Sequence, residues 1–190
     1  MLYRLLITLA LLGSVTLPTS AFAADYDADL SHSSVLFKVL HGGVGFTYGM
    51  FTRMNGALTW GESVEGHQIT FEVEADSVFT NNRRRDRHLK SDDFFDAQQF
   101  PKITFTSTRW VQSGEGSFQV TGNLTLRGVT KEITIPVRQT GSGTNRRGKQ
   151  ILGFASTFTV TRSEFGVSYG LPTVAADQVE LIVNLELVAR

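Results

Sequence analysis

Apolar and polar residues alternate with a period of two along most of this chain, and this feature limits its fold more than any other. In residues 67–76, for example, Ile69, Phe71 and Val73 occupy every second position, with polar side chains between them. Successive side chains of a β-strand point to opposite faces of the sheet, so this pattern predicts a strand with one buried face. Comparable runs recur between residues 34 and 187, and short, often glycine-containing turns separate most of them.

About eight such runs follow one another, and no segment between them is long enough for the helix that would connect parallel strands. The pattern predicts an all-β fold, an eight-stranded antiparallel barrel of up-and-down strands with short helical insertions. Closure into a barrel is favoured because it removes the unpaired edge strands of an open sheet. A two-sheet sandwich is the alternative, since a period of two occurs in both architectures.

The first 23 residues differ from the rest of the chain. Arg4 precedes a continuous apolar run from Leu5 to Val15, Pro18 ends that run, and residues 21–23 form a small-x-small cleavage site. These features predict a secretory signal peptide in residues 1–23. The apolar run is shorter than the roughly 20 residues that a membrane-spanning helix needs. We therefore expect an exported protein with one domain, residues 24–190, and no transmembrane segment after cleavage.

Charge and composition exclude several classes of function. The chain has 18 basic and 18 acidic residues, and only Arg4 lies in the predicted signal peptide, so the remainder is nearly neutral and nucleic-acid binding is disfavoured. The absence of cysteine excludes disulfides, thiolate metal sites and thiol nucleophiles. An exported domain without disulfides needs a substantial core, and 14 phenylalanines can supply it.

One segment, residues 80–101, reads neither as a strand nor as a tight turn. It gathers Arg83, Arg84, Arg85, Arg87, His88 and Lys90 among four aspartates, followed by Phe94, Phe95 and Phe100. Connections carry most special chemistry in an all-β scaffold, so we expect the phenylalanines to cap the barrel and one or more arginines to meet an anionic group. Arginine suits phosphate because its planar fork donates two parallel hydrogen bonds. The alternative is a solvated loop, whose exposed ion pairs contribute only about 0–1 kcal/mol each.

The interior of an eight-stranded barrel is just wide enough to be filled by side chains or to hold one small ligand. The residues expected to face it are Val35, Phe37, Ile69, Phe71, Phe105, Phe118, Phe154, Phe158, Val183 and Leu185. For each of them, an ordinary place in a packed core is the alternative. In the run that begins at Ile103, strict alternation places Ile103 and Phe105 on one face and Trp110 on the other.

Several short motifs together resemble a known family. They are Thr80, Asn82, Arg85-Asp86, His88-Leu89, Asp93-Phe94-Phe95-Asp96, Phe100-Pro101, Ile103-Thr104-Phe105, Ser107-Thr108, Gly122-Asn123-Leu124-Thr125, Gly128-Val129-Thr130-Lys131, Gly153-Phe154, Arg162-Ser163, Phe165-Gly166, and the early His32-Ser33 with Phe37, Val39 and His41. In the order in which they occur along the chain, they resemble the signature of the YceI-like family of secreted bacterial proteins. Arg83 and Arg84 make the insertion more basic than that signature requires, and Gly42-Gly43 loosen the first bend.

The resemblance implies a lipocalin-like barrel in the periplasm that binds a polyisoprenoid or another long-chain amphiphilic lipid in its interior. The candidate ligand-binding residues are then Val35, Phe37, His41, Ile69, Phe71, Arg83, Arg84, Phe94, Phe95, Phe105, Phe118, Phe154, Phe158 and Val183. Arg85, Asp86 and His88 belong to the signature, and we expect them to form a structural network that holds the insertion on the barrel.

Other functions remain open at this point. A filled barrel could act as a stress-response or protein-interaction module that displays the basic segments 83–90 and 146–149. A catalytic or metal site could be assembled from His41, His88 and nearby aspartates, but their spacing matches no metal motif, and we expect no enzyme activity, metal or cofactor. A homodimer is compatible with such a chain, although no residue argues for it.

Overall fold

The computed structural model describes residues 23–190, so the predicted signal peptide lies, except for Ala23, outside the described residues. The strands are β1 (Ala24–Ala28), β2 (Ser34–His41), β3 (Gly45–Phe51), β4 (Met54–Trp60), β5 (Gln68–Glu74), β6 (Val78–Phe79), β7 (Lys102–Gly114), β8 (Ser117–Leu126), β9 (Val129–Thr144), β10 (Gln150–Thr161) and β11 (Ala175–Ala189). One α-helix, α1 (Arg83–Lys90), and three short 3₁₀ helices, η1 (Val64–Gly66), η2 (Ala75–Ser77) and η3 (Arg162–Phe165), complete the described fold. Among residues 23–190, no helix has the length and apolar character needed to cross a bilayer.

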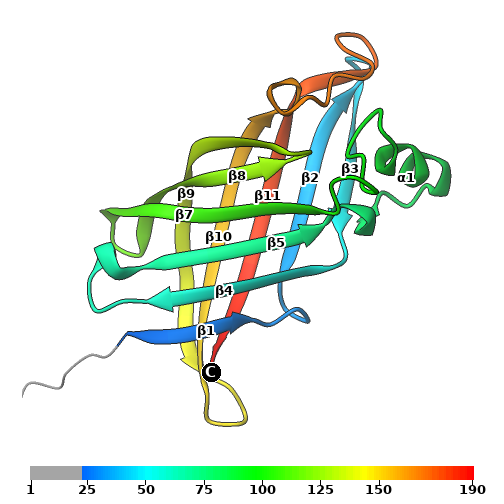
Figure 1. The fold of residues 1–190 in the computed structure, drawn as a ribbon. Coiled ribbons are helices and arrows are strands. Elements are labelled where there is room, and N and C mark those ends of the chain that lie inside the picture. Colours follow the sequence, from blue (N-terminus) through cyan, green and yellow to red (C-terminus); the bar gives the residue numbers. More distant parts are fainter. Residues whose placement is uncertain (1–22) are drawn as a thin grey trace, which may run out of the picture.

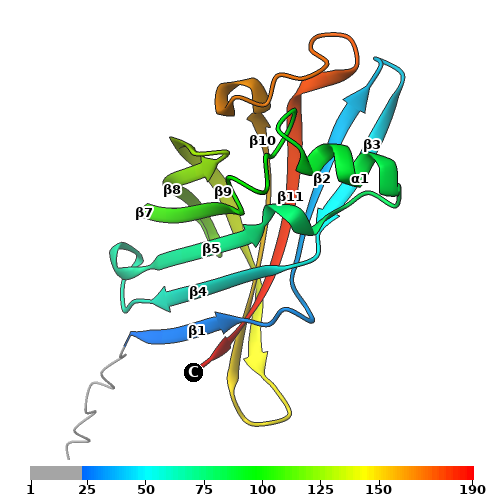
Figure 2. The same cartoon turned by 45° about the vertical axis from the view of Figure 1, so that its right-hand side comes forward.

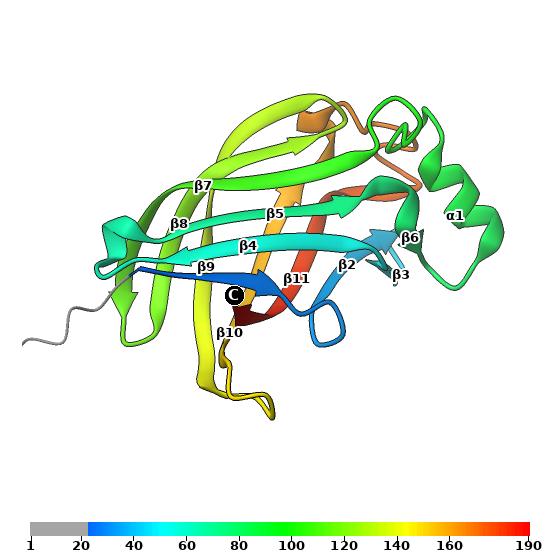
Figure 3. The ribbon, with the colours of Figure 1, turned by 60° about the horizontal axis from the view of Figure 1, so that its bottom comes forward.

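Eight antiparallel strands close into a barrel in the order β1-β4-β5-β7-β8-β9-β10-β11. The ring closes where β1 returns to β11, with Tyr26 opposite Ala189 and Ala28 opposite Leu187. The strands of the two walls cross steeply, as the tilt of barrel strands requires (Figures 1 and 3). The predicted antiparallel barrel is therefore confirmed, and the two-sheet alternative is wrong.

One end of the barrel is flared. There β2 pairs with the first part of β11, β3 pairs with β2, and β6 adds only two residues to β3. In the described part of the chain, β6 ends the sheet without reaching β7. Helix α1 and the connection from η3 to β11 lie at this end, beside the β2–β3 hairpin (Figure 2). A packed cluster that includes Tyr26, Phe118 and Leu187 fills the barrel away from this end, whereas this end forms a mouth.

Residue Trp110 corrects a prediction from strict alternation. It is buried inside the barrel with Phe118 and Phe154. Strict alternation predicted that Trp110 would lie on the face opposite to Ile103 and Phe105. The register between β7 and β8 shifts between Ser107 and Arg109, so Thr108 is an extra residue in β7. A β-bulge of this kind moves every later side chain of its strand to the other face.

The insertion at residues 80–101 contains α1. Its N-cap is Asn82, whose side chain accepts hydrogen bonds from the backbone N–H groups of Arg84 and Arg85 at 3.1 and 3.0 Å. This cap satisfies two donors that the first helical turn would otherwise leave unpaired. Leu89 packs on the core cluster formed by residues of β2, β3, β5 and β6, so the helix is held against the flared wall.

Candidate ligand-binding cavity

A cavity of about 770 Å³ occupies the flared half of the barrel. Its lining includes residues of β2, β3, β5, β7, β8, β9, β10 and β11, together with residues of α1, of the segment that follows α1, and of η3 and its connection to β11. Most of these side chains are aliphatic or aromatic, because they come from the inward positions of the alternating strands. The barrel is therefore hollow toward its mouth, with space for an apolar group.

Three phenylalanines of the wall lie against glycines of neighbouring strands. A Cβ atom added to Gly56 would lie 2.6 Å from Phe71, and one added to Gly122 would lie 2.5 Å from Phe105. Phe37 has the same relationship to Gly49. Glycine permits this close approach because it has no side chain. The three rings occupy space at the wall that a side chain would otherwise fill, and all three line the cavity.

The floor of the cavity is a packed aromatic cluster. Trp110 lies edge-on to Trp60 at 6.2 Å and to Phe118 at 5.5 Å between ring centroids. The indole N–H of Trp110 donates to Ser107 Oγ at 3.1 Å, and the same oxygen accepts from the backbone N–H of Ile69 at 2.9 Å. The buried N–H groups of Trp110 and Ile69 are thus satisfied, and Trp110 closes the cavity below while also lining it.

Several polar groups of the cavity lie at its mouth. Arg84, Arg85 and His88 reach the mouth from α1, Asn82 reaches it from the N-cap of α1, and Tyr169 from the opposite connection. A long-chain amphiphile has an apolar tail and one polar end, and such a ligand would place the polar end here.

Arg85 and Asp86 hold the start of α1 on the barrel through Thr80. Asp86 Oδ1 accepts from the backbone N–H and the hydroxyl of Thr80, at 2.8 and 2.6 Å. Arg85 donates from Nε to Thr80 Oγ1 at 2.7 Å and from Nη2 to the carbonyl of Thr80 at 2.8 Å. Thr80 is buried, so these bonds fix both side chains to the wall. Arg85 also lines the cavity, so its network lies beside the mouth.

His88 lies between the helix and the mouth. Its Nε2 is 2.8 Å from Asp93 Oδ2, and its ring lies edge-on to Phe94 at 5.0 Å and to Tyr169 at 4.8 Å. The histidine therefore connects the insertion to the connection that follows η3. Among the described residues His88 forms no hydrogen bond with Thr80, so its hydrogen bond is separate from the network of Arg85 and Asp86.

Arg162 shapes the other rim of the mouth. This buried side chain donates from Nε to the carbonyl of Ala176 and from Nη1 to that of Val167, both at 2.9 Å. Its Nη2 donates to the carbonyls of Tyr169 and Ala175, at 3.0 and 3.1 Å. Burial lowers the pKa of Arg162 from its usual value, although such a group stays protonated. One guanidinium thus holds the connection that carries Tyr169.

Most of the predicted ligand-binding residues meet around one cavity. Those that line it are Val35, Phe37, His41, Ile69, Phe71, Arg84, Phe94, Phe95, Phe105, Phe154, Phe158 and Val183. Two do not: Phe118 packs in the aromatic floor beneath it, and Arg83 lies outside it on the exposed side of α1. Phe100, expected to cap the barrel, lies instead against Gly128 in the turn between β8 and β9.

Some residues of this site were not predicted as ligand contacts. Arg162 and Tyr169 belong to a segment that breaks the alternation, and a change of pattern was the only local signal. Leu89 lines the cavity from the buried side of α1. An apolar residue within a run of charged ones was the signal that could have identified it.

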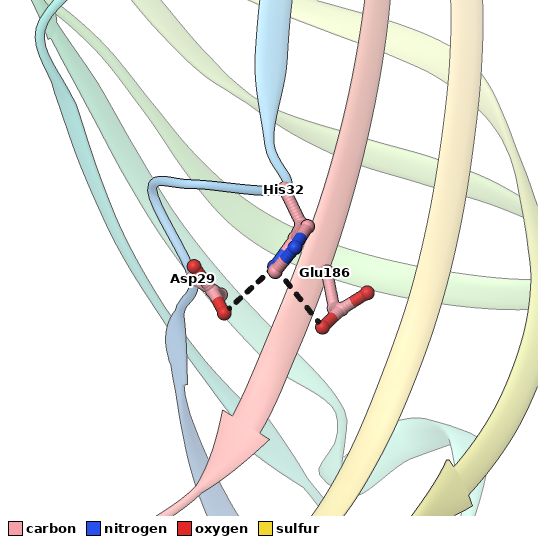
Figure 4. Close-up of side chains that lie close together, drawn as sticks. All are labelled: Asp29, His32 and Glu186. Atoms are coloured by element: carbon pink, nitrogen blue, oxygen red, sulfur yellow. Dashed lines mark hydrogen bonds and ion pairs between the residues drawn. The ribbon is translucent and has the colours of Figure 1, made fainter. Parts of the chain in front are cut away.

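A second cluster of titratable groups lies away from the cavity, where β1 meets β11 (Figure 4). His32 Nδ1 is 3.0 Å from Asp29 Oδ2 and 3.6 Å from Glu186 Oε1. The hydrogen bond to Asp29 raises the pKa of His32, and the same bond lowers the pKa of Asp29. These three ligand atoms are close enough to hold a cation, but the ion pairs of a protonated histidine already account for their arrangement.

A family model and a bacterial relative both match nearly the whole described chain. A family model described as a YceI-like domain matches residues 26–187. A UPF0312 protein of Shewanella denitrificans is 36% identical over 180 residues, covering 92% of this chain and 94% of the relative. This relative therefore matches nearly the whole chain.

Solved structures share the fold at lower identity. BcnA of Burkholderia cenocepacia superposes with a TM-score of 0.77 at 23% identity, over 84% of this chain and 98% of BcnA. A domain of Saccharophagus degradans described as polyisoprenoid-binding superposes with a TM-score of 0.68 at 14% identity, over 87% of this chain and 98% of that domain. Each likeness extends over most of this chain.

Proposed function

The chain belongs to the YceI-like family, and from this premise we propose that it binds a polyisoprenoid or a similar long-chain lipid inside its barrel. The observation that carries the proposal is the apolar cavity of about 770 Å³ with polar groups gathered at its mouth. Its volume lies within the range of roughly 300–1,000 Å³ that is typical of small-molecule sites. The shared fold with a polyisoprenoid-binding domain supports the choice of ligand class.

The energetics favour a ligand bound mainly by its tail. Burial of each CH₂ group contributes about 0.8 kcal/mol, so about twenty buried carbons supply roughly 16 kcal/mol against an association cost of about 4–15 kcal/mol. The groups at the mouth then have only to orient the polar end. Arg84 is the cavity-lining arginine that makes no side-chain hydrogen bond to a described residue, so it is the proposed contact for an anionic head group.

The proposed role is that of a binding or carrier protein in the periplasm, reached through the predicted signal peptide. Catalysis has less support. Asp86 is engaged by Thr80 and the His88 ring is engaged by Asp93, so these groups serve the structure of the insertion.

The position of Trp110 allows a direct test. A Trp60→Phe variant retains Trp110 as its single tryptophan, at the floor of the cavity. A fatty alcohol or polyprenol brominated at the end of its tail should quench that residue, whereas an analogue brominated near its head group should quench it less. Equal quenching by the two analogues, or none by either, would contradict binding with the tail in the cavity.

A further inference from the structure

Exposed apolar side chains gather at the rim of the cavity mouth. On the β2–β3 hairpin, Val44 is 94% exposed, Phe46 56% and Tyr48 57%. Val174 and Tyr169, on the connection between η3 and β11, are also large and exposed. We call these five residues the mouth patch. Exposed apolar surface of this kind commonly marks a site of contact with a protein or a membrane.

The two segments of the mouth patch are joined. The backbone N–H of Gly42 donates to the carbonyl of Val174 at 3.0 Å, so the hairpin tip and the connection lie side by side. Gly42 and Gly43 have positive φ angles, and Val44 is the only residue with a side chain in the stretch 42–45. The turn therefore presents one aliphatic side chain beyond the end of the sheet.

Cationic side chains lie at the same end of the barrel. Arg83, Arg84 and Arg87 project from α1 and are exposed. Within residues 23–190, none of the three forms an ion pair. Helix α1 lies beside β3, whose first residues carry Phe46 and Tyr48 (Figures 1 and 2). The apolar hairpin tip and the unpaired arginines beside it are complementary to a partner that has an anionic outer layer and an apolar interior.

We propose that the mouth patch docks on the surface of an anionic lipid bilayer, with the cavity mouth facing the membrane. Val44 and Phe46 would enter the boundary between head groups and acyl chains, and Tyr48 and Tyr169 would lie at head-group level, where aromatic residues are enriched. The arginines of α1 would meet the lipid phosphates. Docking goes beyond binding in the cavity, and it would let a lipid move between the bilayer and the barrel without crossing water.

Vesicle co-sedimentation tests the apolar part of the contact. The folded part, residues 24–190, contains every strand of the closed barrel and is the form to use. It should bind vesicles of equal parts phosphatidylcholine and phosphatidylglycerol. Val44→Asp should weaken that binding by about tenfold or more, whereas Val111→Asp should not, because Val111 is 43% exposed on the outer face of β7. Equal binding by both variants and the unchanged protein would overturn the proposal.

Charge is tested separately. Replacing Arg83, Arg84 and Arg87 together by glutamine should weaken binding to these vesicles by about tenfold to a hundredfold, with little effect on vesicles of phosphatidylcholine alone. The matched control replaces Arg146, Arg147 and Lys149, in the turn between β9 and β10 at the opposite end of the barrel, by glutamine (Figure 1). Equal losses from the two triple substitutions would contradict an oriented contact.

A site-specific label separates a membrane from a second copy of the chain. Since the chain has no cysteine, Val44→Cys and Val111→Cys can each carry one environment-sensitive fluorophore. Addition of vesicles should shift the emission at position 44 to shorter wavelength and leave position 111 unchanged. A shift that follows protein concentration without vesicles, with dimers in sedimentation equilibrium, would overturn the proposal. Tail binding to Trp110 is measured with free lipid, so a failure of docking is distinguishable from a failure of cavity binding.

Discussion

Phe71 of β5 lies against the backbone of Gly56 in the neighbouring strand β4, where an added Cβ atom would come within 2.6 Å of the ring. Phe37 with Gly49, and Phe105 with Gly122, repeat this arrangement around the cavity. Each glycine accommodates a large ring at the wall and so leaves space in the centre of the barrel. The hollow interior therefore depends on small residues as much as on large apolar ones.

The first prediction concerns this arrangement. Gly56→Ala should push the ring of Phe71 toward the centre of the cavity, because the new Cβ atom and the ring cannot both stay in place. We expect a loss of about 1–3 kcal/mol in the free energy of unfolding, measured in urea. The affinity for long-chain lipids should fall more than the affinity for short-chain lipids. Gly141→Ala is the control, since no atom lies within 4 Å of its added Cβ. Similar behaviour of the two variants would contradict the packing argument.

The second prediction separates two adjacent arginines. Arg84 lines the cavity and Arg83 does not. Arg84→Ser should weaken binding of a polyprenyl phosphate by about tenfold or more through loss of a charge-assisted hydrogen bond, and should leave binding of the uncharged polyprenol nearly unchanged. Arg83→Ser should affect neither ligand. Isothermal titration of both ligands measures the four affinities, and equal effects of the two substitutions would exclude a specific head-group contact by Arg84.

The third prediction concerns the rim held by Arg162. Arg162→Met should leave four backbone carbonyls without their donor and destabilise the protein by about 3 kcal/mol or more. Arg162→Lys should restore little, because an ammonium group has three donors without the planar fork of a guanidinium. Hydrogen exchange should become faster in residues 166–176, the segment that Arg162 binds. Arg109→Met, on the exposed face of β7, should leave this exchange unchanged.

The fourth prediction is a pH dependence with two opposing parts. The folded-state pKa of His32 is raised above its ordinary 6.5 by Asp29, so its stabilising contribution is fully present below that value and is lost as pH rises through the folded pKa. Burial lowers the pKa of His67, which stacks on Trp60 at 3.6 Å. The unfolded chain then binds the extra proton at low pH, so stability falls as pH drops below 6.5.

Two variants separate these contributions in thermal unfolding across mildly acidic to mildly alkaline pH. His32→Asn should lower stability most at acidic pH and least at alkaline pH. His67→Phe should remove the acid-side decrease that is expected from His67. If the stability of His32→Asn differed from that of the unchanged protein by the same amount at every pH, the ion pairs of Figure 4 would not form in solution.

The strands and their inward faces could be predicted from the sequence because the period of two is a local property. Phe71, Phe105 and Phe158 alternate with polar residues, and all three line the cavity. Trp110 was assigned to the wrong face because the bulge at Thr108 arises from pairing with β8, which no local pattern specifies.

Local sequence patterns could not predict which way each residue of α1 points. They also could not predict how far along the barrel axis an inward-facing residue lies. Neighbouring helical residues point in directions about 100° apart, so Arg83 and Arg84 could be distinguished only once Leu89 fixed the buried face of α1. Phe118 points inward as predicted, but it lies in the floor rather than beside the cavity. The hollow itself follows from which glycine faces which phenylalanine, and that depends on the register between strands.

Native mass spectrometry of the protein, purified without detergent from its own cellular compartment, tests the central claim most directly. We expect a population carrying one long-chain lipid, released by organic extraction and identified as a polyisoprenoid or a similar amphiphile. Val183→Trp, which places an indole in the lining of the cavity, should reduce that population. A protein mass without ligand that persists after incubation with polyprenyl phosphates and polyprenols would contradict the account.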